Sequence, residues 1–335
     1  MKVGLFNTVR GGKARFAPYA DRYEELELVE FDCPPAMENL EKLAEEGCEA
    51  MIYTADHKEP EAFFKKLSEC GIRYICCCCA GYDHFDLEAM KKYGIRGANV
   101  PVYSPNAISE HTVLLVLAAL RNFRKQLLQV EKCRYGLNGL MGRELRNMNV
   151  GVVGAGRIGF TTIRCLSGFG PKKIYAYDPF PNPKVEEYAS FVSLGELYAQ
   201  CDVIIYHAIY NESSHHMVNR ESIQTMKDGV VLVNTSRGGL FDAEAVLEGI
   251  ESGKLGGVCL DVIEGEGQLR KKPEYDSCPI PVLGKLLEHD NVIFTSHSAF
   301  YTDEADRNLS EGTVENLLSY ARTGSCDREL VRDQE

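Results

Sequence analysis

The sequence predicts an α/β protein built from two Rossmann- or flavodoxin-like parallel-sheet domains. Its 335 residues are enough for two hydrophobic cores. Short runs rich in β-branched residues alternate with segments of helical apolar spacing along most of the chain. A strand–turn–helix unit near the middle of the chain also carries three glycines at fixed spacing. This alternation is typical of parallel sheets whose strands are joined by helices.

Residues 1 to about 100 form the first alternating region. We expect strands at residues 3–6, 26–31, 50–54, 74–79 and 96–100, and helices at residues 37–46, 59–70 and 87–93. Ala80, Gly81, Tyr82 and Asp83 follow the fourth strand, at the edge where open α/β sheets bind ligands. Gly81 would let a small anion approach the backbone closely, although an ordinary turn between strand and helix explains it about equally well.

A turn-rich stretch at residues 101–107 leads out of this region. Ser104 and Pro105 fit the N-cap and the first position of a long apolar helix at residues 108–120. We interpret this stretch as the crossing between the two domains. Residues 121–147 are polar, helical at first and then loop-like. We expect these residues to form either an arm that packs on a second subunit or a segment that is simply exposed to solvent.

The three glycines lie directly after a short apolar strand at residues 150–153. Gly154 permits a tight turn, Gly156 lets a pyrophosphate approach the backbone, and Gly159 lets helix and strand pack closely. A second strand at residues 174–177 ends in Asp178, which lies 19 residues after Gly159 and can accept hydrogen bonds from the adenosine ribose. No Arg or Lys lies beside this acid. The unit therefore predicts a dinucleotide site that favours NAD over NADP.

Charged or titratable side chains follow three of the later strands. After the glycine unit we expect strands at residues 203–206, 230–234, 258–261 and 292–295, and helices at residues 222–227, 243–251 and 304–321. Arg237 follows the second of these strands, Asp261, Glu264 and Glu266 lie at or after the third, and His297 follows the last. In a doubly wound sheet these strand ends can face one cleft. Taken singly, each residue is more often an ordinary surface or structural group than a catalytic one.

Composition narrows the function classes. The net charge of −12, with Lys and Arg scattered, argues against nucleic acid as the main partner. No stretch has the pattern of a signal peptide, and no apolar segment reaches the roughly 18 residues of a membrane span. Thirteen cysteines without a secretion signal favour a reduced, cytoplasmic location. We therefore expect no membrane partner.

Two clusters look at first like metal sites. Residues 76–79 are four consecutive cysteines, but neighbouring side chains on a strand point to opposite faces and cannot converge on one ion. We interpret them as small apolar residues that fill a buried strand, with an exposed redox thiol as the alternative. His215 and His216 are adjacent, yet no acid or Cys lies at ligand spacing, so we interpret them as loop. The sequence therefore predicts no metal.

The chain resembles the D-isomer-specific 2-hydroxyacid dehydrogenase family in four motifs that occur in order, namely G-V-V-G-A-G-R-I-G, V-N-T-S-R-G-G-L, L-D-V-I-E-G-E and T-S-H-S-A-F-Y-T. A further segment, P-V-Y-S-P-N-A-I-S-E-H, is similar to the part of that family that enters the cofactor domain. The similarity covers essentially the whole chain. It implies that His297 donates a proton to a 2-keto oxygen, that Glu266 orients this imidazole, and that Arg237 binds the substrate carboxylate.

The resemblance also implies binding residues. The cofactor NAD would be bound by Gly154, Gly156, Arg157, Ile158, Gly159, Asp178, Ala208, Ile209, Thr235, Ser236, Arg237 and Asp261. Asp261 would bind the nicotinamide carboxamide. The substrate would be bound by Ala80, Gly81, Tyr103, Arg237 and Phe300. The domains implied are a substrate-binding domain at residues 1–102 and 298–335 and an NAD-binding Rossmann domain at residues 103–297, with the active cleft between them.

Details within the motifs resemble the D-lactate dehydrogenase branch. Glu266 is followed by Gly267, where other branches commonly have Pro, and a polar segment at residues 268–280 comes next. Two departures are the loop 207–210, which lacks the usual Pro, and Ser296, which replaces a Pro. The first of these leaves the fine geometry of cofactor binding open.

The function implied is NAD-dependent reduction of pyruvate to D-lactate by a cytoplasmic homodimer. One alternative is a reductase for bulkier 2-ketoacids, that is, a 2-hydroxyisocaproate or phenyllactate dehydrogenase. Another is a dinucleotide-sensing scaffold resembling the co-repressors of the same family. The retained Arg, Glu and His count against the scaffold.

Overall fold

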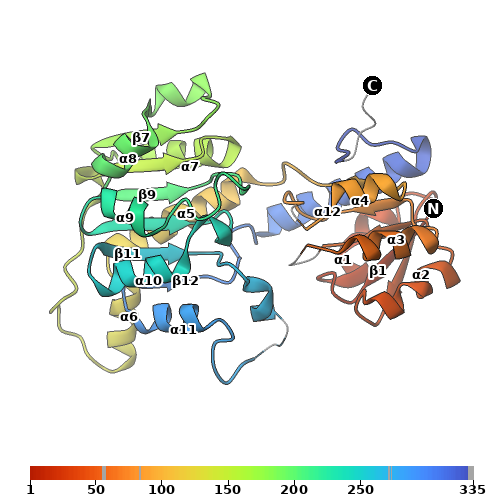
Figure 1. Ribbon diagram of the computed structural model, residues 1–335, viewed down its shortest axis with the longest axis horizontal. Coiled ribbons are helices and arrows are strands. Elements are labelled where there is room, and N and C mark those ends of the chain that lie inside the picture. Colours follow the sequence, from red (N-terminus) through yellow and green to blue (C-terminus); the bar gives the residue numbers. More distant parts are fainter. Residues whose placement is uncertain (55–57, 83, 271, 273, 331–335) are drawn as a thin grey trace. The chain divides into compact units, whose positions relative to one another are not determined.

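The computed structural model describes residues 1–54, 58–82, 84–270, 272 and 274–330, and the chain divides into two compact units (Figure 1). The first unit comprises Met1–Ser104 and Thr302–Glu335, and the second comprises Pro105–Tyr301. Both units contain parallel sheets covered by helices, which confirms the predicted α/β class. Among the residues described, none of the helices combines the length and the apolar character that crossing a bilayer requires.

The first unit contains a five-stranded parallel sheet in the order β2-β1-β3-β4-β5. Its strands are β1 Lys2–Phe6, β2 Glu27–Phe31, β3 Ala50–Ile52, β4 Tyr74–Cys76 and β5 Arg96–Ala98. Its helices are α1 Gly12–Ala20, α2 Glu41–Glu45, α3 Glu61–Glu69, α4 Leu87–Lys92 and α12 Asp303–Thr323, with a 3-10 turn at Met37–Asn39. Aromatic and aliphatic side chains of β1, β3, β4 and α3 form its core.

Several features of the first unit differ from the sequence predictions, and two of them are instructive. Helix α1 was not predicted; it contains Pro18 and its N-cap, Gly11, makes no side-chain cap, so the usual start signals are missing. The strand predicted to run to residue 79 ends at Cys76.

Helix α12 begins after Thr302, whose side chain caps Ala305 N, and ends at Gly324 with a left-handed φ of 71°.

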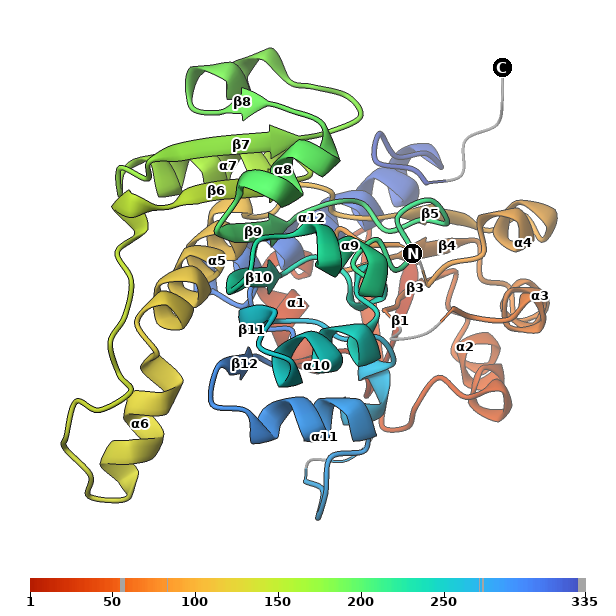
Figure 2. The same cartoon turned by 60° about the vertical axis from the view of Figure 1, so that its left-hand side comes forward.

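The second unit contains a seven-stranded parallel sheet in the order β12-β11-β10-β9-β6-β7-β8 (Figure 2). Its strands are β6 Asn149–Val153, β7 Lys173–Tyr177, β8 Ser190–Phe191, β9 Val203–Tyr206, β10 Val230–Asn234, β11 Leu255–Leu260 and β12 Val292–Phe294. Its helices are α5 Pro105–Leu120, α6 Phe123–Glu131, α7 Arg157–Ser167, α8 Leu194–Gln200, α9 Arg220–Thr225, α10 Ala243–Glu251 and α11 Pro281–Glu288. Its 3-10 turns are Leu145–Asn147, Pro183–Glu187, Gly238–Leu240 and Glu266–Arg270.

Alternating residues of the central strands enter two separate cores. Val152 of β6 packs in a core with side chains of α5 and α7, whereas Val153 packs in a core with side chains of α8, α9 and α10. Because helices cover both faces of the sheet, its strands appear in the sequence as continuous apolar runs. Helices α8 and α11 were not predicted, although Ser193 and Glu196 form a capping box at the start of α8.

The carboxyl ends of the strands of the second unit lie in register. Val153 pairs with Tyr206 and Tyr177, and Tyr206 pairs with Asn234. Asn234 in turn pairs with Leu260, and Leu260 with Phe294. The loops that follow these strands therefore begin along one edge of the sheet. The chain order reverses between β6 and β9, which is the switch point where doubly wound sheets bind ligands.

Candidate active site

The predicted glycine loop joins β6 to α7 at this switch point. Gly154 has a φ of 90°, and a Cβ there would lie 2.6 Å from Ala208 N. A Cβ at Gly159 would collide with the carbonyl oxygen of Gly154. A Cβ at Gly156 meets nothing within 4 Å, so this N-cap of α7 faces open space. The first and third glycines thus serve close packing, and the second leaves room in front of the helix terminus.

Asp178 lies directly after β7 and is tied to the glycine loop. Its Oδ2 accepts a hydrogen bond of 2.8 Å from Ala155 N, and its Oδ1 accepts one of 2.8 Å from Phe180 N. The carboxylate is thereby held beside the turn that is predicted to bind pyrophosphate. A carboxylate can accept further bonds, so its predicted contact with a ribose hydroxyl stays compatible with this geometry.

The loops after β9 and β10 are joined by their own hydrogen bonds. Ser236 Oγ donates to Ala208 O at 2.8 Å, and Thr235 Oγ1 lies 2.8 Å from Thr112 Oγ1 of α5. His207 lies 2.9 Å from Thr162 Oγ1 of α7, and burial lowers the pKa of this imidazole to about 3. His207 is therefore neutral and structural, and it fixes the loop that carries Ala208.

Arg237 lies three residues past the end of β10 in an extended conformation. Its Nη1 donates to Ser236 O at 3.0 Å, and its carbonyl accepts a bond of 2.9 Å from Asn234 Nδ2. A Cβ at Gly238 would collide with the backbone of Ile263 and Glu264. Glycine at this position therefore lets the Arg237 loop lie against the loop that leads to Glu266.

His297 and Glu266 form a direct pair. His297 Nδ1 is 2.5 Å from Glu266 Oε1, and Glu266 Oε2 accepts a bond of 3.1 Å from Ile263 N. His297 has a left-handed φ of 49°, which is unusual for a residue with a side chain. The Phe300 ring packs edge-on with a centroid distance of 6.1 Å. Because Nδ1 is engaged by Glu266, the predicted proton transfer would have to use the second ring nitrogen, Nε2.

Asp261 holds the segment that carries His297. Its carboxylate accepts bonds from Thr295 Oγ1 at 2.5 Å, from Ser298 N at 2.9 Å and from Ala299 N at 3.0 Å. The side chain is 1% exposed. This anchoring role was not predicted from the sequence, which assigned Asp261 to the nicotinamide carboxamide; that assignment stays a prediction. His111 of α5 was also missed, and its Nε2 lies 3.0 Å from Thr295 Oγ1.

The predicted site residues fall in both units. The second unit contains the three proposed catalytic residues, the predicted cofactor residues and Phe300. Arg157 and Ile158 open α7, and Ile209 follows Ala208 on the surface. Ala80, Gly81 and Tyr103 belong to the first unit, where Asn99 Nδ2 donates to Ala80 O and Asn308 Nδ2 donates to Tyr103 O, each at 2.6 Å. Their role in substrate binding stays a prediction, and Asp83 lies outside the described residues.

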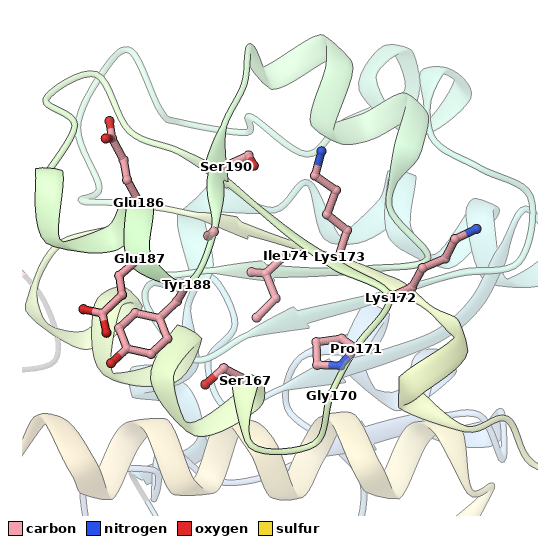
Figure 3. A pocket seen from close by; sticks show the side chains of 11 residues that line it. Ser167, Gly170, Pro171, Lys172, Lys173, Ile174, Glu186, Glu187, Tyr188 and Ser190 are labelled. Carbon is pink, nitrogen blue, oxygen red and sulfur yellow. The ribbon is translucent and has the colours of Figure 1, made fainter.

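A separate hollow of about 420 Å³ lies at the opposite end of β7 (Figure 3). Its lining includes Lys172 and Lys173 at the amino end of that strand, with Glu186, Glu187 and Tyr188 across from them. Ligands of doubly wound sheets bind at the carboxyl ends of the strands. The hollow is therefore not the predicted cofactor site.

The second unit fits NAD on its own geometry. The space in front of Gly156 meets the N-terminus of α7, and the Asp178 carboxylate is held beside the same turn. Backbone N–H groups and the helix dipole suit a pyrophosphate, and a carboxylate suits ribose hydroxyls. The direct His297–Glu266 pair, which the sequence predicts to transfer the proton, lies on the same unit.

Comparison with known proteins agrees with this geometry. Residues 113–299 match the NAD binding domain of D-isomer specific 2-hydroxyacid dehydrogenases. An aromatic 2-oxoacid reductase of Clostridium sporogenes is 38% identical and covers 94% of this chain and 95% of its own. The structure of D-lactate dehydrogenase from Escherichia coli superposes with a TM-score of 0.86 at 30% identity, over 99% and 100% of the two chains. That of D-lactate dehydrogenase with NAD⁺ from Lactobacillus jensenii gives 0.83 at 27%, over 99% and 100%.

These matches confirm the family, the cofactor and the fold that the motifs predicted. The family match covers more than half of the chain, and the relatives align along almost their whole length. The chain belongs to the D-isomer specific 2-hydroxyacid dehydrogenase family and is an NAD-dependent oxidoreductase.

Proposed function

We propose that this enzyme reduces pyruvate to D-lactate, with His297 as the acid that protonates the keto oxygen. The observation that carries the proposal is the direct His297–Glu266 pair at the sheet edge that also holds the glycine loop. NAD, when bound as NADH, supplies the hydride. Nε2 of His297 would donate the proton, since Nδ1 is engaged by Glu266. In the reverse direction the same nitrogen would take the proton back.

We propose that Arg237 binds the substrate carboxylate. Its guanidinium is permanently charged and planar, so it can bind a carboxylate and also stabilise negative charge that develops on the carbonyl oxygen. Replacing Arg237 with Gln should raise the KM for the 2-oxo acid and lower kcat. An unchanged response to the 2-oxo acid would refute the assignment.

A second candidate substrate is an aromatic 2-oxo acid such as phenylpyruvate. The observation that favours it is sequence identity over nearly the whole chain, because the aromatic 2-oxoacid reductase of Clostridium sporogenes is 38% identical over 94% of this chain and the D-lactate dehydrogenase of Escherichia coli is 32% identical over 99%. The decisive measurement is kcat/KM with NADH for pyruvate, 2-ketobutyrate, 2-ketoisocaproate and phenylpyruvate. Preference for pyruvate supports the first candidate, preference for phenylpyruvate supports the second, and absence of turnover with all four rejects both.

We further propose a cytoplasmic homodimer formed through residues 121–147. Figure 2 shows α6 and the chain after it standing away from the sheet of the second unit. Large apolar side chains on this segment are exposed, namely Phe123, Leu127, Val130, Tyr135, Leu137 and Met141. Exposed apolar groups on a projecting segment favour a covering partner. Light scattering should give twice the chain mass, and Leu137→Glu together with Met141→Glu should give the monomer.

A further inference from the structure

Two histidines and a glutamate form a cluster apart from the His297–Glu266 pair. His215 and His216 lie in the loop between β9 and α9, and Glu264 lies in the loop after β11. One ligand atom from each lies within 4.8 Å of the other two. His216 Nε2 is 2.9 Å from Glu264 Oε2, and the two imidazole rings stack with centroids 3.8 Å apart. The acid that sequence spacing did not reveal is thus supplied by a loop 48 residues away.

Neighbouring groups hold both histidines in place. Tyr210 OH lies 3.2 Å from His215 Nδ1, so Nε2 is the nitrogen of that ring that would bind a metal. His216 has a left-handed φ of 49°, and its backbone N donates to Gly239 O at 2.9 Å. In metal sites a histidine ligand usually engages its other ring nitrogen in such an outer contact. The cluster therefore has both the ligand atoms and part of the support that a metal site needs.

We infer that His215, His216 and Glu264 bind one divalent transition-metal ion of the zinc class. Imidazole nitrogen and carboxylate oxygen are ordinary zinc ligands at about 2.0–2.2 Å, and three protein ligands leave a position for water. The ligand atoms lie within 4.8 Å of one another, and binding one ion would draw them closer together. A bound ion would tie the loop after β9 to the loop that carries Glu266. This site is independent of the 2-oxo acid that the enzyme uses.

The test is calorimetric titration of the full-length, chelator-treated enzyme with Zn²⁺ under reducing, metal-free conditions. We expect one ion per chain with micromolar or tighter affinity, and at least a tenfold loss of affinity in His216→Ala and in Glu264→Gln. His289→Ala is the matched control, because it removes a histidine outside the cluster, and it should bind like the parent enzyme. Glu264→Gln is nearly isosteric, and NADH binding checks that each variant is folded. Unchanged affinity in Glu264→Gln, or no binding at 100 µM, would overturn the proposal.

A different observation concerns two thiols in the first unit. Cys77 and Cys79 lie in the loop directly after β4, and their Sγ atoms are 2.8 Å apart. Because β4 ends at Cys76, the bend after it brings these two side chains together, which the strand prediction did not anticipate. The Sγ atoms lie 3.4 and 3.0 Å from Gly81 O, and His84 Nε2 lies 3.6 Å from Cys77 Sγ.

We also propose that Cys77 and Cys79 are a site of reversible disulfide formation. Cys79 is partly exposed and would attack a small disulfide such as oxidised glutathione, releasing one reduced glutathione. The Cys77 sulfur would then attack the Cys79 sulfur and release the second, with His84 Nε2 accepting the Cys77 proton. Two thiols become one disulfide as one oxidised glutathione becomes two reduced molecules. Burial raises the pKa of the Cys77 thiol, which is why a nearby base matters.

The expected effect of this disulfide on activity rests on the proposed function. Ala80 and Gly81 are predicted to bind the substrate carboxylate, so a disulfide across the preceding residues should raise the KM for the 2-oxo acid reversibly. The chemical step is tested separately, by peptide mass mapping after incubation with oxidised glutathione. We expect a Cys77–Cys79 link in the parent enzyme and in Cys133→Ser, which removes an exposed thiol elsewhere. In Cys77→Ser, glutathione should stay attached to Cys79. Stable glutathione on Cys79 of the parent enzyme, without the internal link, would overturn this proposal whatever the turnover shows.

Discussion

Two of the histidine–carboxylate pairs in the second unit, His297–Glu266 and His111–Asp261, have different geometries. His297 Nδ1 is 2.5 Å from Glu266 Oε1, whereas His111 Nε2 is 3.7 Å from Asp261 Oδ1. Thr295 lies between the members of the second pair, because its hydroxyl donates to Asp261 and is 3.0 Å from His111 Nε2. The first pair is thus a direct contact, and the second is a bridged network.

The two pairs also differ in their exposure to solvent. The side chains of His297 and Glu266 are 31% and 20% exposed, whereas those of His111 and Asp261 are 18% and 1% exposed. Burial lowers the pKa of His111, and the Asp261 carboxylate opposes this effect only in part. His111 is therefore neutral at pH 7 and takes part in the hydrogen-bond network with Thr295 and Asp261. The comparison teaches that proximity of a histidine to an acid does not by itself mark a proton donor; direct contact and access to solvent set His297 apart from His111.

The sharpest way to break this comparison is to remove each histidine in turn. His297→Ala should lower kcat about 10²- to 10⁴-fold, because a positioned acid contributes that much to proton transfer. NADH affinity should stay within about twofold. His111→Ala should lower kcat far less and should reduce stability instead. Steady-state turnover of pyruvate and fluorescence titration with NADH give both quantities, and equal losses of kcat in the two variants would contradict the assignment.

Substitution of Glu266 should mainly reduce activity, whereas substitution of Asp261 should mainly reduce stability. Glu266→Gln keeps the shape of the side chain but removes its charge, so kcat should fall about 10- to 100-fold, as expected when one charge-assisted hydrogen bond is lost. Asp261→Asn should instead lower the free energy of unfolding by about 1–3 kcal/mol, because an amide N–H₂ cannot accept from a backbone N–H.

Urea unfolding and turnover of both carboxylate variants test this separation. A stable Asp261→Asn variant that has lost only NADH affinity would show that the nicotinamide contact, predicted from the family resemblance, outweighs the anchoring role. An unstable Glu266→Gln variant with normal kcat would remove the distinction between the pairs.

The glycine loop and the three proposed catalytic residues could be predicted from the sequence because each follows a strand in a motif of several residues. Gly154, Gly156 and Gly159 can be placed from their spacing, since the first and third serve close packing and the second leaves room before the helix terminus. Arg237, Glu266 and His297 each had an ordinary alternative until the order of the motifs was considered. The register of β10, β11 and β12 explains why residues so far apart in sequence begin from one edge.

The missed features depend on contacts that no local pattern contains. The bridge from His111 to Asp261 joins α5 to the loop after β11 through Thr295 of the loop after β12, and nothing in the sequence links these three positions. The acid beside His216 likewise comes from another loop. Helix α8 is different, because its Ser193–Glu196 capping box was present in the sequence and could have predicted it.

A third histidine, the partly buried His207, extends the comparison to a ring that contacts a hydroxyl and not an acid. Burial lowers the pKa of His207 to about 3, so the folded chain does not protonate it at ordinary pH, whereas an unfolded histidine titrates at about 6.5. Since the unfolded chain then binds a proton that the folded chain does not, this contribution to stability is complete above pH 6.5. It falls by about 1.4 kcal/mol for each pH unit below that.

His207→Gln removes this titration while Gln can still bond to Thr162. The stability difference between the parent enzyme and the variant should therefore shrink by about 2 kcal/mol between pH 7.5 and pH 5.0. Urea unfolding at the two pH values measures it. A difference that stays constant, or that grows at pH 5.0, would mean that His207 is already charged in the folded chain.

The smallest effect should come from the hydroxyl that bridges His111 and Asp261. Thr295→Val removes it while Asp261 still accepts from Ser298 N and Ala299 N, so the free energy of unfolding should fall by about 1 kcal/mol. The kcat should change by less than about threefold, because His297 and Glu266 are untouched. Thr225→Val is the matched control, since its hydroxyl bonds only within the exposed end of α9. If Thr295→Val lowered kcat as much as Glu266→Gln does, the bridged network would be part of the proton-transfer chemistry, and the separation of the two pairs would be wrong.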